Sequence, residues 1–537
     1  MKNALLSVYH KEGIVEFAKA LVELDFTIYA SGGTFKHLTG NGIAALPVSD
    51  LVGGEAILGH RVVTLSREVH AGLLAKNTEE DIAELENLAI PRLDLVCVDL
   101  YPLEEEIAKP HSTRESVIEQ TDIGGPTMIR SGAKGGRIVV CDPKDRQKVI
   151  AWLKAGEPAN GFVDELCAKG EFTIARYCMA SATYLSGGKY SGFFGERVAT
   201  CKYGENAWQA PAHLYSAGTS DPLALDKFAV IEGTPPSFNN WCDIDRLLQT
   251  ATHIAEVFAI NRNSEKAISV GVKHGNPCGT ATIGTGLPET ELTAVVGSNQ
   301  AETLKKMTTG DPLAIFGGLV MTNFEVDEAL CETLIGKMLD GIIAPAFTES
   351  AVAILRRKGD KCRFVANPAL NGLVGNLDRT PRFRYVRGGF LVQPNYTFVP
   401  DFCRREIMKY GKATSAQECD MMLAWAIGST SNSNTITLVK NEQLIGNGVG
   451  QQDRVGAANL AITRAHRSGH DVTGAAAYSD SFFPFPDGPQ TLIDAGVTAI
   501  FTSSGSIKDQ ATIDLCAKHG VVLYMVPDQV GRGFFGH

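Results

Sequence analysis

Two adjacent side chains, Lys273 and His274, have the clearest capacity for chemistry in this chain, in the string GVKHGNPCG at 271–279. Neighbouring residues of an extended strand point to opposite faces, so only a turn lets both reach one substrate. Asn276-Pro277 favours such a turn. An imidazole exchanges protons near neutral pH, and a lysine can act as an acid or polarise a carbonyl. The string therefore predicts acid-base chemistry, with a chance surface pair as the alternative.

Two glycine-containing strings in the first third of the chain predict sites for an anion or a substrate. Ser31-Gly32-Gly33-Thr34 enters an expected helix, where free N–H groups and hydroxyls suit a phosphate. In DIGGPTMIRSGAK at 122–134, Asp122 could accept or deliver a proton, and Lys134 could hold a phosphate or an oxyanion. A capped helix start explains either string without a ligand, so both interpretations stay open.

The elements that must position these residues alternate between strand and helix in the first part of the chain. The pattern predicts strands at ALLSVY, FTIYA, RLDLVCVDL and RIVVCD, and helices at KEGIVEFAKALVELD, SGGTFKHLTGNG and PKDRQKVIAWLKAG. In the first helix, one helical face is expected to carry Ile14, Phe17, Ala18, Leu21 and Val22. This alternation implies an α/β fold with a doubly wound parallel sheet.

A glycine-rich run follows a mostly helical stretch at 162–185 and predicts a domain boundary near residue 195. We expect one domain over residues 1–195 and a second over residues 196–537. The second part also has a mixed α/β pattern and is long enough for two subdomains.

Composition excludes several classes of protein. A formal net charge of -10 argues against general nucleic-acid binding. No apolar run is long enough to span a membrane. Twelve scattered cysteines without a CxxC pair indicate reduced thiols in a cytoplasmic protein. We predict no metal, since His466 and His470 have helical spacing but no third ligand nearby.

Nine strings in order carry a resemblance to a known family. They are ASGGT, DLYP, DIGGPTMIRSGAK, YGEN at 203–206, GVKHGNPCG, GDPLAIFGG at 310–318, DGIIAPAF at 340–347, IGNGVGQQDRV at 445–455 and YSDSFFPFPD at 478–487. Together they closely resemble the bifunctional purine-biosynthesis family that joins aminoimidazole carboxamide ribonucleotide (AICAR) formyltransferase to inosine monophosphate (IMP) cyclohydrolase. The resemblance covers nearly all of the chain.

The resemblance implies a fold, two reactions and a partner. The N-terminal domain would be methylglyoxal-synthase-like, and the C-terminal part would comprise two cytidine-deaminase-like subdomains. The C-terminal part would transfer a formyl group from the co-substrate 10-formyltetrahydrofolate to AICAR. The N-terminal part would close the ring of the formylated product (FAICAR) and release water, giving IMP. The substrates would be small molecules, and the protein would be a homodimer with shared formyltransferase sites.

The resemblance also implies roles for individual residues. Lys273 and His274 would manage the proton of the attacking amine, in an order left open. Asn434, favoured over Asn432 by its spacing to Lys440, would bind the formyl oxygen, and Asp340 the pterin ring. The nucleotide would contact Lys202, Tyr203, Asn240, Arg454, Phe485, Arg532 and Phe534. For ring closure, the catalytic residues would be Tyr101, Asp122 and Lys134, and the binding residues Ser31, Gly32, Gly33, Thr34, Arg61 and Thr64.

Four positions depart from the family pattern. Val63 replaces a lysine and Asp99 an asparagine, which makes the cyclohydrolase pocket more negative by about two charges. A phosphorylated ligand should be repelled unless Asp99 is protonated or paired. Lys202 replaces an arginine, and Trp208 replaces a histidine. Two alternatives therefore stay open: a formyltransferase with a non-catalytic N-terminal binding module, and a nucleotide sensor without activity.

Overall fold

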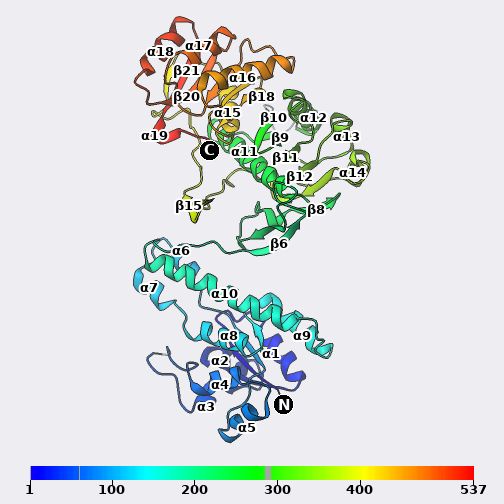
Figure 1. Cartoon of the computed structure of the whole chain (residues 1–537), viewed down its shortest axis with the longest axis vertical. Coiled ribbons are helices and arrows are strands. Elements are labelled where there is room, and N and C mark those ends of the chain that lie inside the picture. The colour runs from blue at the N-terminus through cyan, green and yellow to red at the C-terminus, as the bar shows by residue number, and fades with distance from the viewer. Residues whose placement is uncertain (1, 60, 285–291, 537) are drawn as a thin grey trace. The chain divides into compact units, whose positions relative to one another are not determined.

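The protein, described by a computed structural model over residues 2–59, 61–284 and 292–536, divides into two compact units. They span Met1–Phe194 and Gly195–His537 (Figure 1). The predicted fold class is confirmed: a doubly wound parallel sheet in the N-terminal unit and a larger mixed α/β fold in the C-terminal unit.

Five parallel strands in the order β3-β2-β1-β4-β5 form the sheet of the N-terminal unit. The strands are β1 (Lys2–Ser7), β2 (Phe26–Ala30), β3 (Leu46–Pro47), β4 (Leu95–Val98) and β5 (Ile138–Val140). The helices are α1 (Ile14–Glu23), α2 (Gly32–Gly40), α3 (Val48–Val52), α4 (Arg67–Leu74), α5 (Glu79–Asn87), α6 (Leu103–Ala108), α7 (Arg114–Glu119), α8 (Gly124–Lys134), α9 (Arg146–Lys154) and α10 (Phe162–Leu185).

Helices cover both faces of this sheet, because successive strand residues point to opposite sides. Leu6 of β1 packs with α1 and α9 in one cluster, whereas Leu5 packs with α4 and α8 in another. Val22 lies at the margin of the apolar face of α1 and is 39% exposed, whereas the buried stripe runs through Ile14, Phe17, Ala18 and Leu21. Val22 lies about 100° further round the helix than Leu21, towards solvent.

A sheet of twelve strands forms the centre of the C-terminal unit, in the order β16-β21-β20-β19-β17-β18-β10-β9-β11-β12-β13-β8. Its strands are β8 (Ala229–Glu232), β9 (Lys266–Lys273), β10 (Asn276–Gly284), β11 (Leu319–Thr322), β12 (Gly341–Ala344), β13 (Arg363–Ala366), β16 (Met408–Tyr410), β17 (Ile436–Lys440), β18 (Gln443–Gly448), β19 (Ala476–Ser479), β20 (Ala499–Ser504) and β21 (Val522–Pro527). Two hairpins lie outside it: β6 (Glu196–Cys201) with β7 (Ala212–Ser216), and β14 (Arg382–Val386) with β15 (Gly389–Gln393).

This sheet contains one arrangement twice. Outward from the central pair β10 and β18, the orders are β10-β9-β11-β12-β13-β8 and β18-β17-β19-β20-β21-β16. In both halves the first two neighbouring pairs are antiparallel, the next two are parallel and the last is antiparallel. We call residues 229–366 the first repeat and residues 408–527 the second repeat. The central pairing of β10 with β18 joins them into one sheet.

The helices repeat in the same way. In the first repeat they are α11 (Phe238–Arg262), α12 (Leu292–Gly310), α13 (Glu328–Leu334) and α14 (Glu349–Leu355). In the second they are α15 (Ser415–Gly428), α16 (Arg454–Arg467), α17 (Asp487–Asp494) and α18 (Asp509–Lys518), and α19 (Asp528–Gly531) follows. Helices α11 and α15 share one core cluster that spans both repeats, whereas the remaining helices fill a separate cluster for each repeat on the other face.

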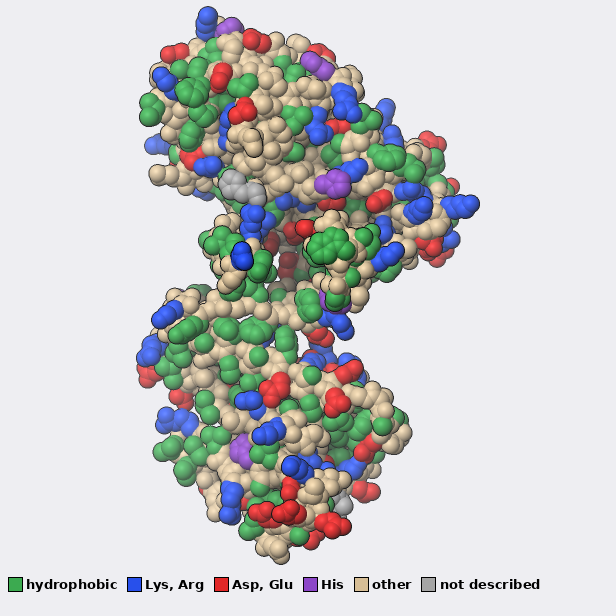
Figure 2. All heavy atoms as spheres, viewed as in Figure 1, with side chains coloured by type: hydrophobic (Ala, Val, Ile, Leu, Met, Phe, Trp, Pro, Cys, Tyr) green, Lys and Arg blue, Asp and Glu red, His purple; other side chains and the backbone are tan. Residues whose placement is uncertain are grey.

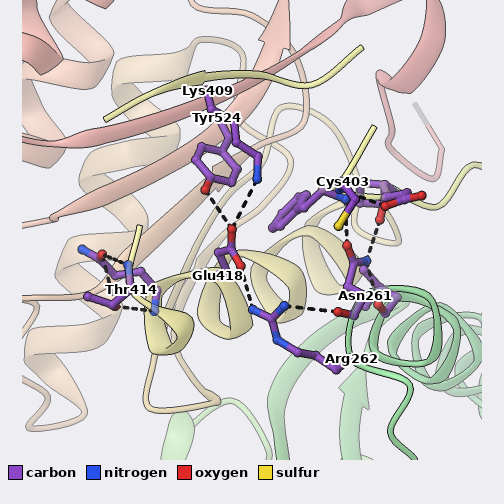
Figure 3. Close-up of polar contacts among 12 residues, drawn as sticks. Asn261, Arg262, Cys403, Lys409, Thr414, Glu418 and Tyr524 are labelled. Atoms are coloured by element: carbon purple, nitrogen blue, oxygen red, sulfur yellow. Dashed lines mark hydrogen bonds and ion pairs between the residues drawn. The ribbon is translucent and has the colours of Figure 1, made fainter. Parts of the chain in front are cut away.

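A polar network around Glu418 ties the two repeats together at the far end of α11 (Figure 3). Glu418 of α15 accepts hydrogen bonds from Arg262 of α11 at 2.7 Å and from the Tyr524 hydroxyl of β21 at 2.8 Å. Lys409 of β16 lies 3.5 Å away. Burial raises the pKa of Glu418, but the bonds from Arg262 and Tyr524 outweigh it and leave this pKa lowered.

The surface carries charges of both signs. Figure 2 shows Lys and Arg side chains interspersed with Asp and Glu over the visible face of each unit. Among the described residues, no helix has the length and apolar character needed to cross a membrane.

Candidate active sites

The first candidate site lies at the carboxyl ends of β1, β2 and β4. The chain order of the strands reverses between β1 and β4, and such a switch point leaves a crevice where ligands bind in open α/β sheets. Tyr9 follows β1, and Tyr101 follows β4, with their ring centroids 5.5 Å apart. The string predicted to bind phosphate begins α2 directly after β2.

The start of α2 is open towards this crevice. Ser31 precedes the helix, and a Cβ added at Gly32 or Gly33 would meet no atom within 4 Å. The Ser31 hydroxyl donates to Ser7 Oγ at 2.8 Å. Thr34 instead points inward: it is buried, and its Oγ1 accepts from Val8 N at 3.0 Å. The helix start can therefore offer amides to an anion, while Thr34 orders the loop after β1.

Asp99 is paired with backbone rather than exposed to the crevice. Its carboxylate accepts hydrogen bonds from Tyr9 N and, at 3.2 Å, from His10 N. Burial raises the pKa of Asp99, and these amides oppose the rise. The Lys11 amine donates to Tyr9 O at 3.0 Å; burial lowers the pKa of Lys11, and the charge of Asp99 opposes this. The repulsion expected from Asp99 is thus offset by two amides and a nearby amine.

Asp122 lies beside Tyr101 before the start of α8. Its Oδ1 accepts from Gly125 N at 2.8 Å. Burial raises the pKa of Asp122, and the charge of Asp99 adds to the rise. A Cβ at Gly124 would lie 2.6 Å from Thr64 Oγ1, so this glycine permits the close approach of Thr64. A carboxyl group with a raised pKa can deliver a proton as well as accept one.

Other predicted residues of this unit lie further out. Lys134 is exposed at the opposite end of α8 from Asp122, roughly 16 Å along an eleven-residue helix. Arg61 is exposed and donates to Leu58 O at 2.8 Å. Val63, in place of the family lysine, packs against a core cluster. The structure therefore brings Tyr101, Asp122 and Thr64 together, but not Lys134.

The second candidate site begins at the hairpin between β9 and β10. Lys273 ends β9 and pairs with Asn276, and the two residues between them have left-handed backbones, with φ of 53° at His274 and 71° at Gly275. Such two-residue turns match the twist of the strands. The Lys273 amine donates to Phe316 O, whereas His274 is exposed at the tip of the turn. The predicted turn places both side chains at one edge of the sheet.

Strand register brings Asp340 to the same edge. Leu319 of β11 pairs with Val272 of β9 and with Gly341 of β12. One residue outward, Lys273, Gly318 and Asp340 therefore lie in a row, with about 5 Å between neighbouring strands. A Cβ at Gly317 would lie 3.8 Å from Lys273 Nζ, and this glycine has φ of 72°.

The second repeat contributes the carboxyl ends of β19, β20 and β21 to this edge. Arg454 begins α16 and forms a buried ion pair with Asp480, which directly follows β19. Arg532 lies 3.7 Å from Asp528 and 5.3 Å from the ring centroid of Phe534. Phe485, in the loop after β19, is 59% exposed, so it does not pack in the core.

The loop 431–434 joins the two repeats at the site. Asn432 N donates to Asn276 Oδ1 at 3.1 Å, beside the Lys-His turn. Asn434 Nδ2 donates to Gln451 O at 2.9 Å, and its backbone exchanges two hydrogen bonds with Gln451 at 3.1 Å. Asn432 thus contacts the turn directly, whereas Asn434 is held by Gln451, and the choice of Asn434 as the formyl contact stays a prediction.

A cavity of about 320 Å³ lies between the repeats, next to this edge. Lys273 and His274 line it together with Asp311 and Arg464, which form an ion pair at 3.0 Å. Sequence reasoning did not single out Asp311, Arg464 or Asn447, although Asp311 lies in the string GDPLAIFGG. Arg464 and Asp311 come from different repeats, so only the assembled sheet brings them together.

The start of α11 closes the site on another side. Asn240 is buried, and its Oδ1 accepts from Ser237 N at 3.0 Å as part of a helix cap. The neighbouring Asn239 donates to Glu205 O at 3.3 Å, which holds the loop of Lys202 and Tyr203 against the helix. Trp208 is 81% exposed. Among the described residues, no group of three or more His, Cys, Asp and Glu could hold a metal ion.

Comparisons with known proteins agree with this geometry. Residues 136–464 match the AICARFT/IMPCHase bienzyme model, and residues 13–127 match the MGS-like domain. The bifunctional purine biosynthesis protein PurH of Anoxybacillus flavithermus is 36% identical, with 97% of this chain and 98% of that protein covered. PurH of Macrococcus caseolyticus is also 36% identical, with 98% of each chain covered, and PurH of Bacillus cereus is 35% identical over 97% of this chain and 98% of that protein.

Among solved structures, the one described as the crystal structure of ForH is 32% identical. It covers 35% of this chain and 100% of its own length, with a TM-score of 0.32.

Proposed function

Because this chain belongs to the AICARFT/IMPCHase bienzyme family, we propose how its two units divide the two reactions of that family. The protein is a bifunctional enzyme of purine biosynthesis, with AICAR formyltransferase and IMP cyclohydrolase activities and a formyl-folate co-substrate. The C-terminal unit transfers the formyl group, and the N-terminal unit closes the ring. The observation that carries this division is that Lys273 and His274 line the cavity between the repeats.

Formyl transfer from 10-formyltetrahydrofolate is an acyl transfer to a weak nucleophile. The 5-amino nitrogen of AICAR forms a bond to the formyl carbon and loses a proton. The bond between that carbon and N10 of the folate then breaks, and N10 takes up a proton, so that FAICAR and tetrahydrofolate are released. A base near the amine and an acid near N10 both speed this exchange.

His274 is the better placed base. Its imidazole is exposed at the tip of the turn, whereas the Lys273 amine already donates to Phe316 O and lies 6.0 Å from the Phe316 ring centroid. Lys273 is thereby directed as a hydrogen-bond donor, which suits stabilising the formyl oxygen or protonating N10. Asn434 would bind the formyl oxygen and Asp340 the pterin, at the same edge of the sheet.

The nucleotide would lie along the edge formed by the second repeat. Three segments that meet at the carboxyl ends of β19–β21 supply Arg454, Phe485, and the pair Arg532 and Phe534. Guanidinium groups suit the phosphate or the carboxamide, and the exposed Phe485 ring can stack on the base. Lys202, Tyr203 and Asn240 would approach from the start of α11.

Ring closure is mainly a positioning problem. The carboxamide nitrogen of FAICAR bonds to the formyl carbon, and the former formyl oxygen leaves as water. Asp122 and Tyr101 lie together and would deliver a proton to that oxygen, and the open start of α2 would bind the phosphate. Lys134 lies at the other end of α8 from Asp122, so it would contact a bound ligand only at a point distant from Asp122.

Val63 and Asp99 are compatible with ring closure in this proposal. The Asp99 carboxylate is held by the amides of Tyr9 and His10, and the Lys11 amine lies close by. The pocket is therefore less repulsive to a phosphorylated ligand than its formal charge indicates. The loss of the family lysine at Val63 would lower the rate without abolishing it.

A homodimer with shared formyltransferase sites is the proposed assembly. The hairpin of β14 and β15 is a separate two-stranded sheet, and such a hairpin is marginal in water by itself. Tyr385 is 75% exposed and Leu391 is 62% exposed on this hairpin. Arg382 at its base lies 3.2 Å from the ring centroid of Phe535 and anchors it to the C-terminal segment. Burial of this apolar hairpin against a second copy would stabilise it.

The test of the division supplies the protein with AICAR and 10-formyltetrahydrofolate, or with FAICAR alone, and identifies the products by mass spectrometry. IMP from both mixtures supports two working units. FAICAR that accumulates without IMP would leave the N-terminal unit as a binding module.

A further inference from the structure

Asp243 holds the turn that carries His274. This aspartate is the sixth residue of α11 and is only 8% exposed, and its Oδ1 accepts a hydrogen bond from Gly275 N at 2.7 Å. A left-handed backbone at a residue other than glycine costs free energy, so His274 needs such support to keep φ at 53°. Burial raises the pKa of Asp243, and the bond from Gly275 N and the charge of a protonated His274 oppose this rise, so the carboxylate and the imidazole lie close enough to interact.

The second repeat contains the same clamp without the histidine. Asp420 is the sixth residue of α15, and its carboxylate accepts from Asn441 N at 3.0 Å and from Glu442 N at 2.6 Å. Asn441 and Glu442 form the turn between β17 and β18, with φ of 54° and 55°. Clamping a turn by a buried aspartate is therefore a structural feature of both repeats. A neutral Asn441 occupies the place of His274, so the second clamp has no histidine, although the charges of Glu442 and Lys306 act on Asp420.

We propose that Asp243 is a positioning residue for formyl transfer, which holds the His274–Gly275 turn and stabilises the proton that His274 accepts from the AICAR amine. This inference rests on the proposed role of His274 as the base. When the amine attacks, the nitrogen–hydrogen bond breaks and the proton moves to His274, which becomes a cation. A buried carboxylate nearby lowers the free energy of that cation. The proton later leaves His274 for N10 or solvent, so Asp243 stays ionised throughout.

Several other charged or titratable groups surround the pair and contribute to any pH dependence. Arg246 of α11 favours the ionised form of Asp243. The groups that line the cavity around His274 are Lys273 of β9, Cys278 of β10, Asp311 after α12 and Arg464 of α16. Asp311 and Arg464 neutralise each other in an ion pair at 3.0 Å. Burial raises the pKa of the Cys278 thiol to about 12, so it stays neutral.

The test compares Asp243→Asn with Asp420→Asn in the full-length protein. Asparagine keeps an oxygen that can accept the turn amide but removes the charge. For Asp243→Asn we expect kcat of formyl transfer to fall about 10- to 100-fold, with KM for AICAR within about twofold. In a plot of kcat against pH, the acidic limb should move to lower pH, because the protonated base has lost the stabilising charge of the Asp243 carboxylate. Asp420→Asn should keep both kcat and the profile, and lose only thermal stability.

A second variant, Asp243→Glu, retains the charge if Asp243→Asn folds poorly. It should lower kcat through altered geometry while keeping the acidic limb within a few tenths of a pH unit of wild type. The inference would be overturned if the pH dependence of kcat in Asp243→Asn matched wild type. It would also be overturned if Asp420→Asn lost as much kcat as Asp243→Asn. A failure of the underlying function is distinguishable, because wild-type protein would then form no FAICAR.

Discussion

Lys273 and Lys440 occupy the same place in the two repeats: each ends the first strand of a hairpin, directly before two residues with left-handed backbones. Their surroundings differ. Lys273 lines the cavity and donates to Phe316 O, whereas Lys440 donates to Asp471 O at 3.0 Å on the opposite edge of the sheet. The second lysine is therefore a matched control for the first.

Lys273→Met should lower kcat of formyl transfer about 100-fold or more, because one directed donor to a developing oxyanion is lost. Lys440→Met should stay within about twofold of wild type. Steady-state rates of tetrahydrofolate formation measure both, and circular dichroism checks that each variant is folded. Equal losses in the two variants would contradict the assignment of Lys273 to the site.

Val63→Lys should raise the cyclohydrolase rate about tenfold, the scale of one added charge-assisted hydrogen bond. Val63 packs at the edge of a core cluster, and a lysine stem can cover the same apolar surface while its amine reaches solvent or ligand. The rate of IMP formation from FAICAR is the measurement. Val62→Lys, which adds the same charge one residue away, is the control. An unchanged or lower rate in Val63→Lys would mean that the pocket closes the ring without needing a lysine at this position.

Local sequence patterns predicted the elements but not the long-range pairing. The alternation in the first part of the chain led to the parallel sheet, and GVKHGNPCG to a turn that carries Lys273 and His274. The pairing of β10 with β18 joins segments about 160 residues apart, as in the pair Ala281–Gln443, and has no local signal. The ion pair of Asp311 and Arg464 depends on that pairing.

The formal charges of the residues alone do not predict the electrostatic effect of Asp99 on the pocket. The sequence predicts a more negative pocket, but it does not show that two backbone amides lie opposite the new carboxylate. Likewise, the string DIGGPTMIRSGAK suggests that Asp122 and Lys134 act together, whereas a continuous helix holds them at opposite ends. Partners and distances of this kind depend on the three-dimensional structure.

Acid should weaken the Glu418 network. The lowered pKa of Glu418 means that the unfolded chain binds more protons than the folded one, so its contribution to stability is present above the ordinary glutamate value of 4.5. That contribution is lost as pH falls through the lower pKa of the folded state. Thermal unfolding at several pH values from 7 to about 3 should show a smaller loss of stability below the ordinary glutamate value for Glu418→Gln than for wild type.

The control for this measurement is Glu332→Gln, at an exposed glutamate of the same unit. Its unfolding temperature should follow that of wild type across the pH range. If Glu418→Gln also follows wild type at every pH, the network with Arg262 and Tyr524 contributes nothing measurable.

The β14–β15 hairpin should be needed for assembly. The double variant Tyr385→Asp, Leu391→Asp should sediment as a monomer and lose formyl transfer, because charges would be buried in the proposed interface. Its conversion of FAICAR to IMP should remain. Ile507→Asp, at a fully exposed isoleucine (100%), is the matched control and should stay dimeric. A dimeric, active double variant would place the interface elsewhere.

The division of the two reactions is tested most directly by His274→Gln and Asp122→Asn, with product identification by mass spectrometry. His274→Gln should form no FAICAR from AICAR and 10-formyltetrahydrofolate, yet convert added FAICAR to IMP. Asp122→Asn should accumulate FAICAR from the same mixture and form IMP slowly. If either variant loses both reactions while folded, or if His274→Gln still formylates AICAR at the wild-type rate, the proposed division between the two units is wrong.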